Sequence, residues 1–121
     1  MIKIVFCLKR RPEMTREEFQ AYWYDKHAPL VRSHAEVLGI RRYVQVHTLT
    51  DPLNAAIQAS RGAPAEDDGV AELWFDSLEW MAANPSPEAA TAGAALLEDE
   101  RKFIDLANSP VWFAEEKPVI G

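Results

Sequence analysis

The chain has 121 residues, enough for one domain with one hydrophobic core, and its 48% hydrophobic content excludes a disordered protein. The formal net charge of -6 excludes nucleic acid as the main partner, because a protein that follows phosphates needs a dense basic surface. Cys7 is the only cysteine, and no Cys/His spacing resembles a metal site. No stretch approaches the roughly 20 apolar residues that cross a membrane, and no signal peptide is recognisable. We therefore expect a cytoplasmic protein without metal.

Alternating apolar residues predict a first strand over residues 2–9. A helix should begin at Thr15, because the Thr15 hydroxyl can accept from the backbone of Glu18 while the Glu18 side chain reaches back. Met14 and Phe19 are spaced to pack together around this capping box. The helix is predicted to bend near Pro29, to continue to about residue 38 and to stop at Gly39.

The centre of this helix, residues 19–31, combines four aromatic residues, a histidine and a proline. At helical spacing Phe19, Trp23 and Leu30 form one apolar stripe, and His27 lies at its edge. Pro29 removes a backbone donor just after the histidine. His27 is therefore either a general acid or base at the rim of an apolar face, or a structural histidine that bonds a carbonyl at the bend.

The second predicted strand, residues 40–49, places Tyr43, Gln45 and His47 on one face. Residues 50–68 form a long connection with a short helix near 52–60, which is either a lid or a passive loop. A third strand over 69–75 puts Glu72 and Trp74 on the same face as each other.

A short helix should follow the third strand and end at residue 83, before the Asn-Pro pair at 84–85. Ser86 caps a longer helix that we predict over residues 87–106. A fourth strand is expected over residues 111–116.

The order strand, helix, strand, strand, helix, strand predicts one α+β domain over residues 1–121 with the ferredoxin-like βαββαβ topology. Its four-stranded antiparallel sheet would carry helices on one face. The other face would then bear Tyr43, Gln45, His47, Glu72 and Trp74, subject to the register. Such a face often pairs sheet to sheet with a second copy, which encloses a cavity.

The chain resembles the EthD family over nearly its whole length. The resemblance rests on residues 19–31 (FQAYWYDKHAPLV), 42–45 (RYVQ), 68–77 (DGVAELWFDS) and 86–88 (SPE), and residues 103–105 (FID) and 113–116 (FAEE) also fit. It implies a dimeric α+β barrel of ferredoxin-like subunits. Similar proteins include an isomerase and polyketide-tailoring dehydratases and decarboxylases, and these need no metal or organic cofactor. His27 is the most recognisable polar position, while Tyr43 and Trp74 match the aromatic positions of the strands.

His27 can move a proton without a cofactor, because an ordinary imidazole titrates near neutrality. Tyr43 could donate a hydrogen bond to a substrate carbonyl, or it could be a cross-strand aromatic contact. Glu72 could orient His27 or act as a second base, or it could be an ordinary ion-paired carboxylate. The side chains expected to line the substrate pocket are Trp23, Gln45, His47, Glu72 and Trp74.

Three functions are consistent with the sequence. The first is a cofactor-free isomerase, dehydratase or decarboxylase acting on a small apolar carbonyl or lactone, with His27 as general acid or base. The second is a non-catalytic accessory or binding protein of an oxidative degradation pathway that uses the same cavity. The third is an oxidoreductase, a monooxygenase or a haem-binding barrel, in which His27 or His47 would be an axial ligand. In each case we expect a homodimer.

Overall fold

Four strands form one antiparallel sheet in the order β2-β3-β1-β4, which confirms the predicted ferredoxin-like α+β fold. The computed structural model describes residues 1–121. Its strands are β1 (Ile2–Leu8), β2 (Arg42–His47), β3 (Gly69–Phe75) and β4 (Val111–Ala114). Its helices are α1 (Arg16–Tyr22), α2 (Ala28–Leu38), α3 (Pro52–Ala59), α4 (Leu78–Ala83), α5 (Pro87–Glu100), the π-helical turn η1 (Trp23–His27) and the 3₁₀ turn η2 (Leu106–Asn108).

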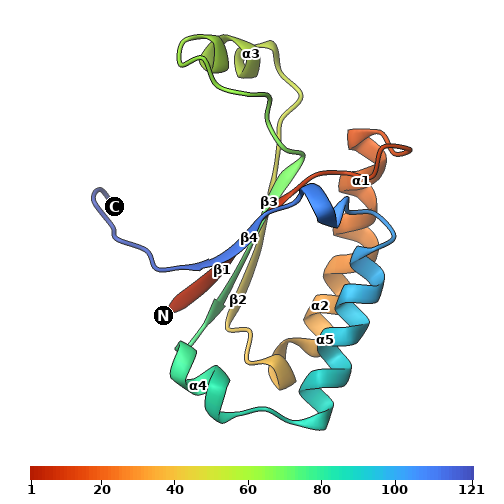
Figure 1. Ribbon diagram of the computed structural model, residues 1–121, viewed down its shortest axis with the longest axis vertical. Coiled ribbons are helices and arrows are strands. Elements are labelled where there is room, and N and C mark those ends of the chain that lie inside the picture. Colours follow the sequence, from red (N-terminus) through yellow and green to blue (C-terminus); the bar gives the residue numbers. More distant parts are fainter.

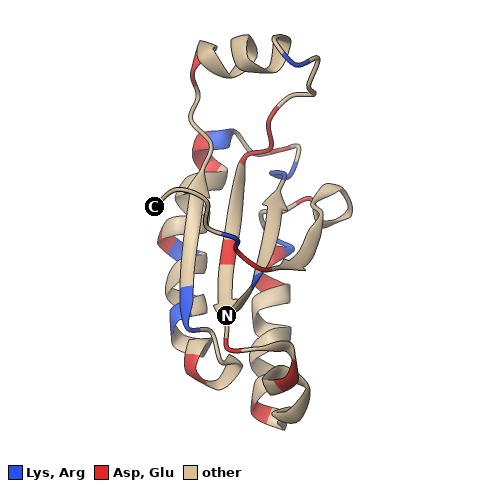
Figure 2. Ribbon diagram, turned by 90° about the vertical axis from the view of Figure 1, so that its left-hand side faces the viewer, with Lys and Arg blue, Asp and Glu red and all other residues tan.

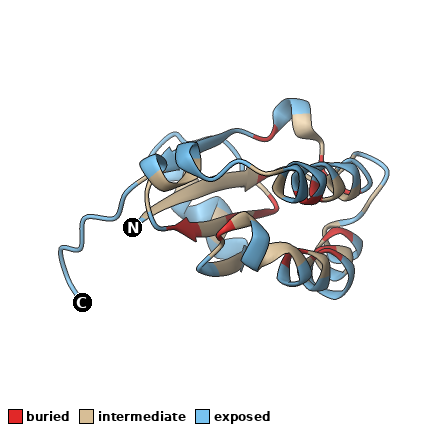
Figure 3. Cartoon of the chain, turned by 90° about the horizontal axis from the view of Figure 1, so that it is seen from below, coloured by how far each residue is buried: buried red, intermediate tan, exposed pale blue.

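Helices α1, α2 and α5 cover one face of the sheet and leave the other face open (Figure 1). The buried residues gather between these two layers, as Figure 3 shows from below. The hydrophobic core consists of Leu8, Phe19, Trp23, Ala71, Phe103 and Ile104. No helix of the structure is both long enough and apolar enough to span a membrane.

The register of β2 overturns one expectation about the faces of the sheet. Tyr43 lies opposite Leu73 and Gln45 opposite Ala71, so the Tyr43, Gln45 and His47 side chains face the helices. Glu72 and Trp74 lie on the open face instead. The expectation that all five side chains share the open face is therefore wrong. Strand β2 presents Tyr43, Gln45 and His47 to the helices, whereas β3 presents Glu72 and Trp74 to the open face.

The predicted first helix begins as expected, and both hydrogen bonds of the Thr15–Glu18 capping box are present. It does not simply bend at Pro29. The chain changes to a π-helical turn over Trp23–His27 before the proline, and the Ala28 amide donates to the carbonyl of Trp23. Pro29 lacks an amide hydrogen, so it cannot close the α-helical bond to residue 25, and the wider turn precedes it. The turn carries both Trp23 and His27 into the buried layer.

Helix α3 stands at the end of an arm that projects beyond the sheet (Figure 1) and has no buried residue. The base of the arm is fastened by Asp68, which is 3% exposed and accepts from the backbone amide of Arg10 and from the guanidinium of Arg16. The predicted short helix near residues 52–60 is thus present. None of the residues that line the candidate site described below belongs to the arm.

Candidate functional site

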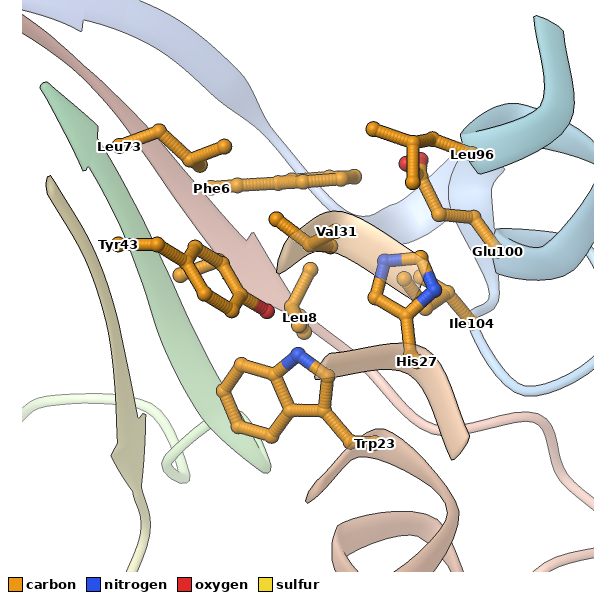
Figure 4. A pocket seen from close by; sticks show the side chains of 11 residues that line it. Phe6, Leu8, Trp23, His27, Val31, Tyr43, Leu73, Leu96, Glu100 and Ile104 are labelled. Atoms are coloured by element: carbon orange, nitrogen blue, oxygen red, sulfur yellow. The ribbon is translucent and has the colours of Figure 1, made fainter. Parts of the chain in front are cut away.

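A small pocket of about 40 Å³ lies between the helix layer and the sheet. Eleven residues line it and nine of them are hydrophobic. The polar groups come from three different elements: His27 from η1, Tyr43 from β2 and Glu100 from the last turn of α5 (Figure 4). An apolar space with a few converging polar groups is the usual form of a small-molecule site.

His27 is held by a carboxylate on a distant part of the chain. Its Nδ1 lies 2.8 Å from Oδ2 of Asp99, and the hydroxyl of Tyr22 donates to the other oxygen of Asp99 at 2.6 Å. Burial favours a higher pKa for Asp99, but the hydrogen bonds from Tyr22 and His27 outweigh it and leave that pKa lowered. Asp99 is therefore ionised at neutral pH, and Nδ1 of His27 carries the proton that it shares with Asp99.

The other ring nitrogen of His27 is left as a proton acceptor. The residue is only 4% exposed, and this burial lowers the pKa of His27 although Asp99 acts in the opposite direction. The imidazole is thus neutral at pH 7, and no protein group is hydrogen-bonded to its Nε2. A neutral imidazole with a fixed tautomer and an unoccupied Nε2 is the form that acts as a general base.

Tyr43 is arranged as a hydrogen-bond donor toward the pocket. Nε2 of Gln45 donates to the Tyr43 hydroxyl at 3.0 Å, and the indole nitrogen of Trp23 is directed at the same oxygen (Figure 4). Burial raises the pKa of Tyr43, against the opposing effect of these two donors, so the phenol keeps its proton. Because its oxygen already accepts, the remaining capacity of the hydroxyl is to donate to a ligand.

Glu100 is the second ionisable group of the pocket. Burial, with a smaller contribution from the charge of Asp99, raises the pKa of Glu100 to about 7. No protein donor is hydrogen-bonded to its carboxyl group. The neighbouring carboxylates of α5 therefore differ at neutral pH: Asp99 is ionised, whereas Glu100 is poised to gain or lose a proton.

The structure brings together Trp23, His27 and Tyr43 of the predicted site residues. Gln45 supports them from behind: its side chain donates to the carbonyl of Trp23 at 2.9 Å as well as to Tyr43. His47 stacks on Trp23 at 4.6 Å between ring centroids and bonds Oε1 of Gln45, outside the pocket.

Glu72 and Trp74 do not belong to this site. Glu72 forms an ion pair with Lys3 at 3.1 Å, and the indole of Trp74 donates to Glu116 at 2.6 Å, both on the open face. Glu72 consequently cannot orient His27, and Asp99 has that position instead. Glu72 and Trp74 do not line this pocket, because their strand presents them to the opposite side of the sheet. That they line a cavity on the open face stays a prediction.

Sequence reasoning missed Asp99 and Glu100, although a signal was present. On α5 Glu100 follows Leu96 by four residues and precedes Phe103 by three, so it lies on the same apolar stripe as these two buried residues. A carboxylate on an apolar stripe is expected to be buried and to have an unusual pKa.

Trp23 supports the floor of the pocket through an unusually close contact with the sheet. A Cβ atom at Gly69 would lie 2.5 Å from the Trp23 ring, so only glycine allows the indole to pack against the start of β3. The same indole lies beside Tyr43 (Figure 4). Gly69 thus helps to set the distance between the π-helical turn and the sheet.

These features define a class: a ferredoxin-like α+β domain with an apolar pocket between its layers, lined by a buried histidine that is hydrogen-bonded to an aspartate outside the pocket. The chain matches the EthD domain over residues 11–107 and belongs to the EthD family, as the sequence resemblance indicated. None of the curated proteins matches it in sequence.

Solved structures share the fold at low sequence identity. An EthD family protein from Bacillus halodurans C-125 is 19% identical, with a TM-score of 0.60 over 97% of this chain and 100% of that one. An EthD-like protein from Ralstonia eutropha JMP134 is 21% identical, with a TM-score of 0.60 over 94% and 90% of the two chains. A dimeric protein with a ferredoxin-like fold from Bacteroides fragilis is 14% identical, with a TM-score of 0.57 over 95% of each chain.

Replacing Glu100 by glutamine should stabilise the protein at alkaline pH. The folded pKa of Glu100 is raised from 4.5 to about 7, so ionisation penalises folding progressively above pH 4.5 and fully above pH 7. Partial access to solvent limits the gain, which we expect to reach about 2 kcal/mol above pH 8 and to vanish near pH 4.5. Urea denaturation across this range measures it. The exposed neighbour Glu98, as Glu98→Gln, is the control, and an equal effect of both variants at every pH would contradict the assignment.

Proposed function

We propose that this protein is a cofactor-free enzyme that moves a proton on a small, mainly apolar substrate carrying a carbonyl or lactone group. The reaction would be an isomerisation, a dehydration or a decarboxylation. The observation that carries the proposal is the buried neutral His27, whose Nδ1 is engaged by Asp99 and whose Nε2 has no protein partner.

The geometry supports a division of roles among three side chains. Nε2 of His27 would take a proton from the carbon beside the carbonyl, breaking the C–H bond and leaving an enolate. Tyr43 would donate a hydrogen bond to the developing oxyanion, which an apolar site makes stronger than in water. Asp99 would stabilise the imidazolium while it exists.

The proton would then return to a different atom of the substrate. Protonated His27 gives it back at another carbon in an isomerisation, or to a departing hydroxyl in a dehydration. In a decarboxylation the C–C bond to the carboxyl group breaks instead, and the carbanion receives a proton. Glu100 can supply or accept a proton in any of these steps, since its pKa is about 7.

The alternative hypothesis, a non-catalytic accessory or binding protein, uses the same pocket. It differs from our proposal only in that the bound molecule does not react. A haem fits the pocket poorly. None of its eleven lining residues is a lysine or arginine that could pair with a propionate, and Glu100 places a carboxyl group on its wall. His27 would have to offer Nε2 to the iron in this setting. We therefore prefer proton transfer to haem chemistry.

Hydrogen–deuterium exchange tests the proposal without the natural substrate. In D₂O the protein should speed deuterium incorporation beside the carbonyl of small ketones and butenolides, as followed by proton NMR. His27→Ala should abolish the enzymatic exchange, and Tyr43→Phe should lower it by about 10²- to 10³-fold, the usual cost of one oxyanion donor. His34→Ala, on α2, is the matched control. If ketones bind but exchange deuterium no faster than in buffer without the protein, the result would support a non-catalytic binding protein instead.

We further propose that the open face of the sheet pairs with the same face of a second copy. In the view of Figure 2 this face carries few charged residues on its strands. Val46 and Trp112 are 45% and 48% exposed on it, which is unusual for large apolar side chains in mid-strand. The structural relative from Bacteroides fragilis is described as dimeric, which supports this arrangement.

Light scattering should give a mass twice the 13.7 kDa of the chain at micromolar concentration. Trp112→Glu would place a charge in the paired face and should yield monomers, because an unpaired buried charge is costly. Tyr24 is an aromatic residue 66% exposed on the helix side, so Tyr24→Glu should remain dimeric. A wild-type monomer, or dissociation by both variants alike, would refute the proposed face.

A further inference from the structure

A second, larger apolar space continues from the His27 pocket. It has a volume of about 560 Å³, and eleven of its fourteen lining residues are hydrophobic. Phe6, Leu73, Leu96 and Glu100 line both spaces, so the two share a boundary of four side chains. We call this second space the tail channel. It runs between α5 and the helix-facing side of the sheet, away from the π-helical turn.

The tail channel lacks the polar side chains that mark the inner pocket. His27 and Tyr43 line the inner pocket and not the channel, whereas the channel extends past Ile4, Phe75, Met81 and Val111. Only Glu100 and Ser109 among its lining residues have a polar group on the side chain. The hydroxyl of Ser109 is already used, because it donates to the carbonyl of Asp105. The channel can therefore recognise its ligand by apolar contact alone.

From this juxtaposition we infer the substrate class: an uncharged carbonyl compound with an extended apolar tail. The carbonyl lies against His27 and Tyr43, and the tail lies in the channel. The position of the carbonyl rests on the proposed function, whereas the binding of the tail does not.

The lining also specifies the charge of the ligand. Neither space has a lysine or an arginine in its wall, and the one acid they share is Glu100. A free carboxylate or phosphate on the ligand would be desolvated without a positive partner, and it would be repelled by ionised Glu100. Ketones, lactones and enols meet this requirement, whereas fatty acids and phosphorylated compounds do not. Among the proposed reactions, this favours isomerisation and dehydration over decarboxylation, whose substrate carries a carboxylate.

Other occupants of the channel are less consistent with the structure. The C-terminal residues 115–121 leave the body on the side opposite to α1, α2 and α5 (Figure 1), so they do not reach the channel. A second copy paired through the open face of the sheet would likewise lie on that opposite side. Continuity with the inner pocket favours a small molecule that fills both spaces.

Gly93 provides a way to close the channel selectively. It lies in α5 and lines the channel, and a Cβ atom built there meets no protein atom within 4 Å. Gly93 is exposed at the edge of the channel, so a large side chain at this position can cover the channel without displacing the core. Alanine favours a helix more than glycine does, so Gly93→Ala should fold at least as well as the wild type.

The test uses straight-chain methyl ketones of five to eleven carbons. Their binding is followed through the indole N–H resonance of Trp23, which lies in the inner pocket and is assigned with Trp23→Phe. Each added methylene should tighten binding about threefold to fourfold, the usual value for burying one CH₂ group. At pH 8 nonanoate should bind at least about tenfold more weakly than the ketone of the same length.

Channel variants separate tail binding from head binding. Gly93→Phe and Gly93→Leu should remove the gain from the longer chains and leave the five-carbon ketone unaffected. Gly93→Ala is the control and should keep most of the gain. Affinity that does not change with chain length, or the same length dependence in Gly93→Phe as in the wild type, would overturn the tail channel. Nonanoate binding as tightly as the matching ketone would overturn the uncharged head.

The outcomes also distinguish this inference from the proposed function. Binding that depends on the length of the ketone but occurs without deuterium exchange would support the tail channel and refute the proposed enzymatic function. Deuterium exchange of short ketones, with an affinity that does not depend on ketone length, would support the enzymatic function and refute the tail channel.

Discussion

The hydrogen bond between His27 and Asp99 is the contact on which the site depends. It joins the π-helical turn of the first helix to the last turn of α5, 72 residues later in the chain, at 2.8 Å. Tyr22, one residue before the π-helical turn, donates to the same carboxylate and so fixes both ends of the turn against α5. Phe103 packs against the rings of Tyr22 and His27 and shields the pair from water. The bond therefore has a structural role in fastening two helices and also fixes the tautomer of His27.

Adjacent carboxylates on α5 show how burial and hydrogen bonding produce different chemistry from the same functional group. Asp99 has two hydrogen-bonded partners that stabilise its charge, and its pKa is lowered. Glu100 points into an apolar space with no donor, and its pKa rises to about 7. The pair thus contains one permanent anion and one group that titrates near neutrality. Such a separation of pKa values allows two carboxylates in one site to take different roles in proton transfer.

Local sequence signals predicted the elements well, because helix caps and strand alternation depend on neighbouring residues. Thr15, Ser86 and Gly39 cap or end helices as their chemistry suggests. The face of β2 could not be predicted in this way. Val44 and Val46 form its more apolar side and resemble a core face, yet the side with Tyr43 and Gln45 packs on the helices, because Trp23 and His47 satisfy the polar groups there.

In the candidate site, too, the sequence predicts what depends on a residue's type and position but not what depends on packing between distant elements. His27 and Tyr43 stand out in the sequence by type and position, and the structure places both in one pocket. Their partner Asp99 could not be identified, because nothing local links residues 27 and 99 and only the packing of α5 brings them together. The sequence alone therefore suggests Glu72 for the orienting role that Asp99 has in the structure.

The tautomer of His27 is the most direct measure of whether the site is organised for proton transfer. Long-range proton–nitrogen NMR of the imidazole rings at pH 7 reports which nitrogen carries the proton, and His27→Gln assigns the signals. We predict a neutral ring with the proton on Nδ1, toward Asp99, and an unprotonated Nε2. An imidazolium at pH 7, or a neutral ring with its proton on Nε2, would contradict His27 as the general base.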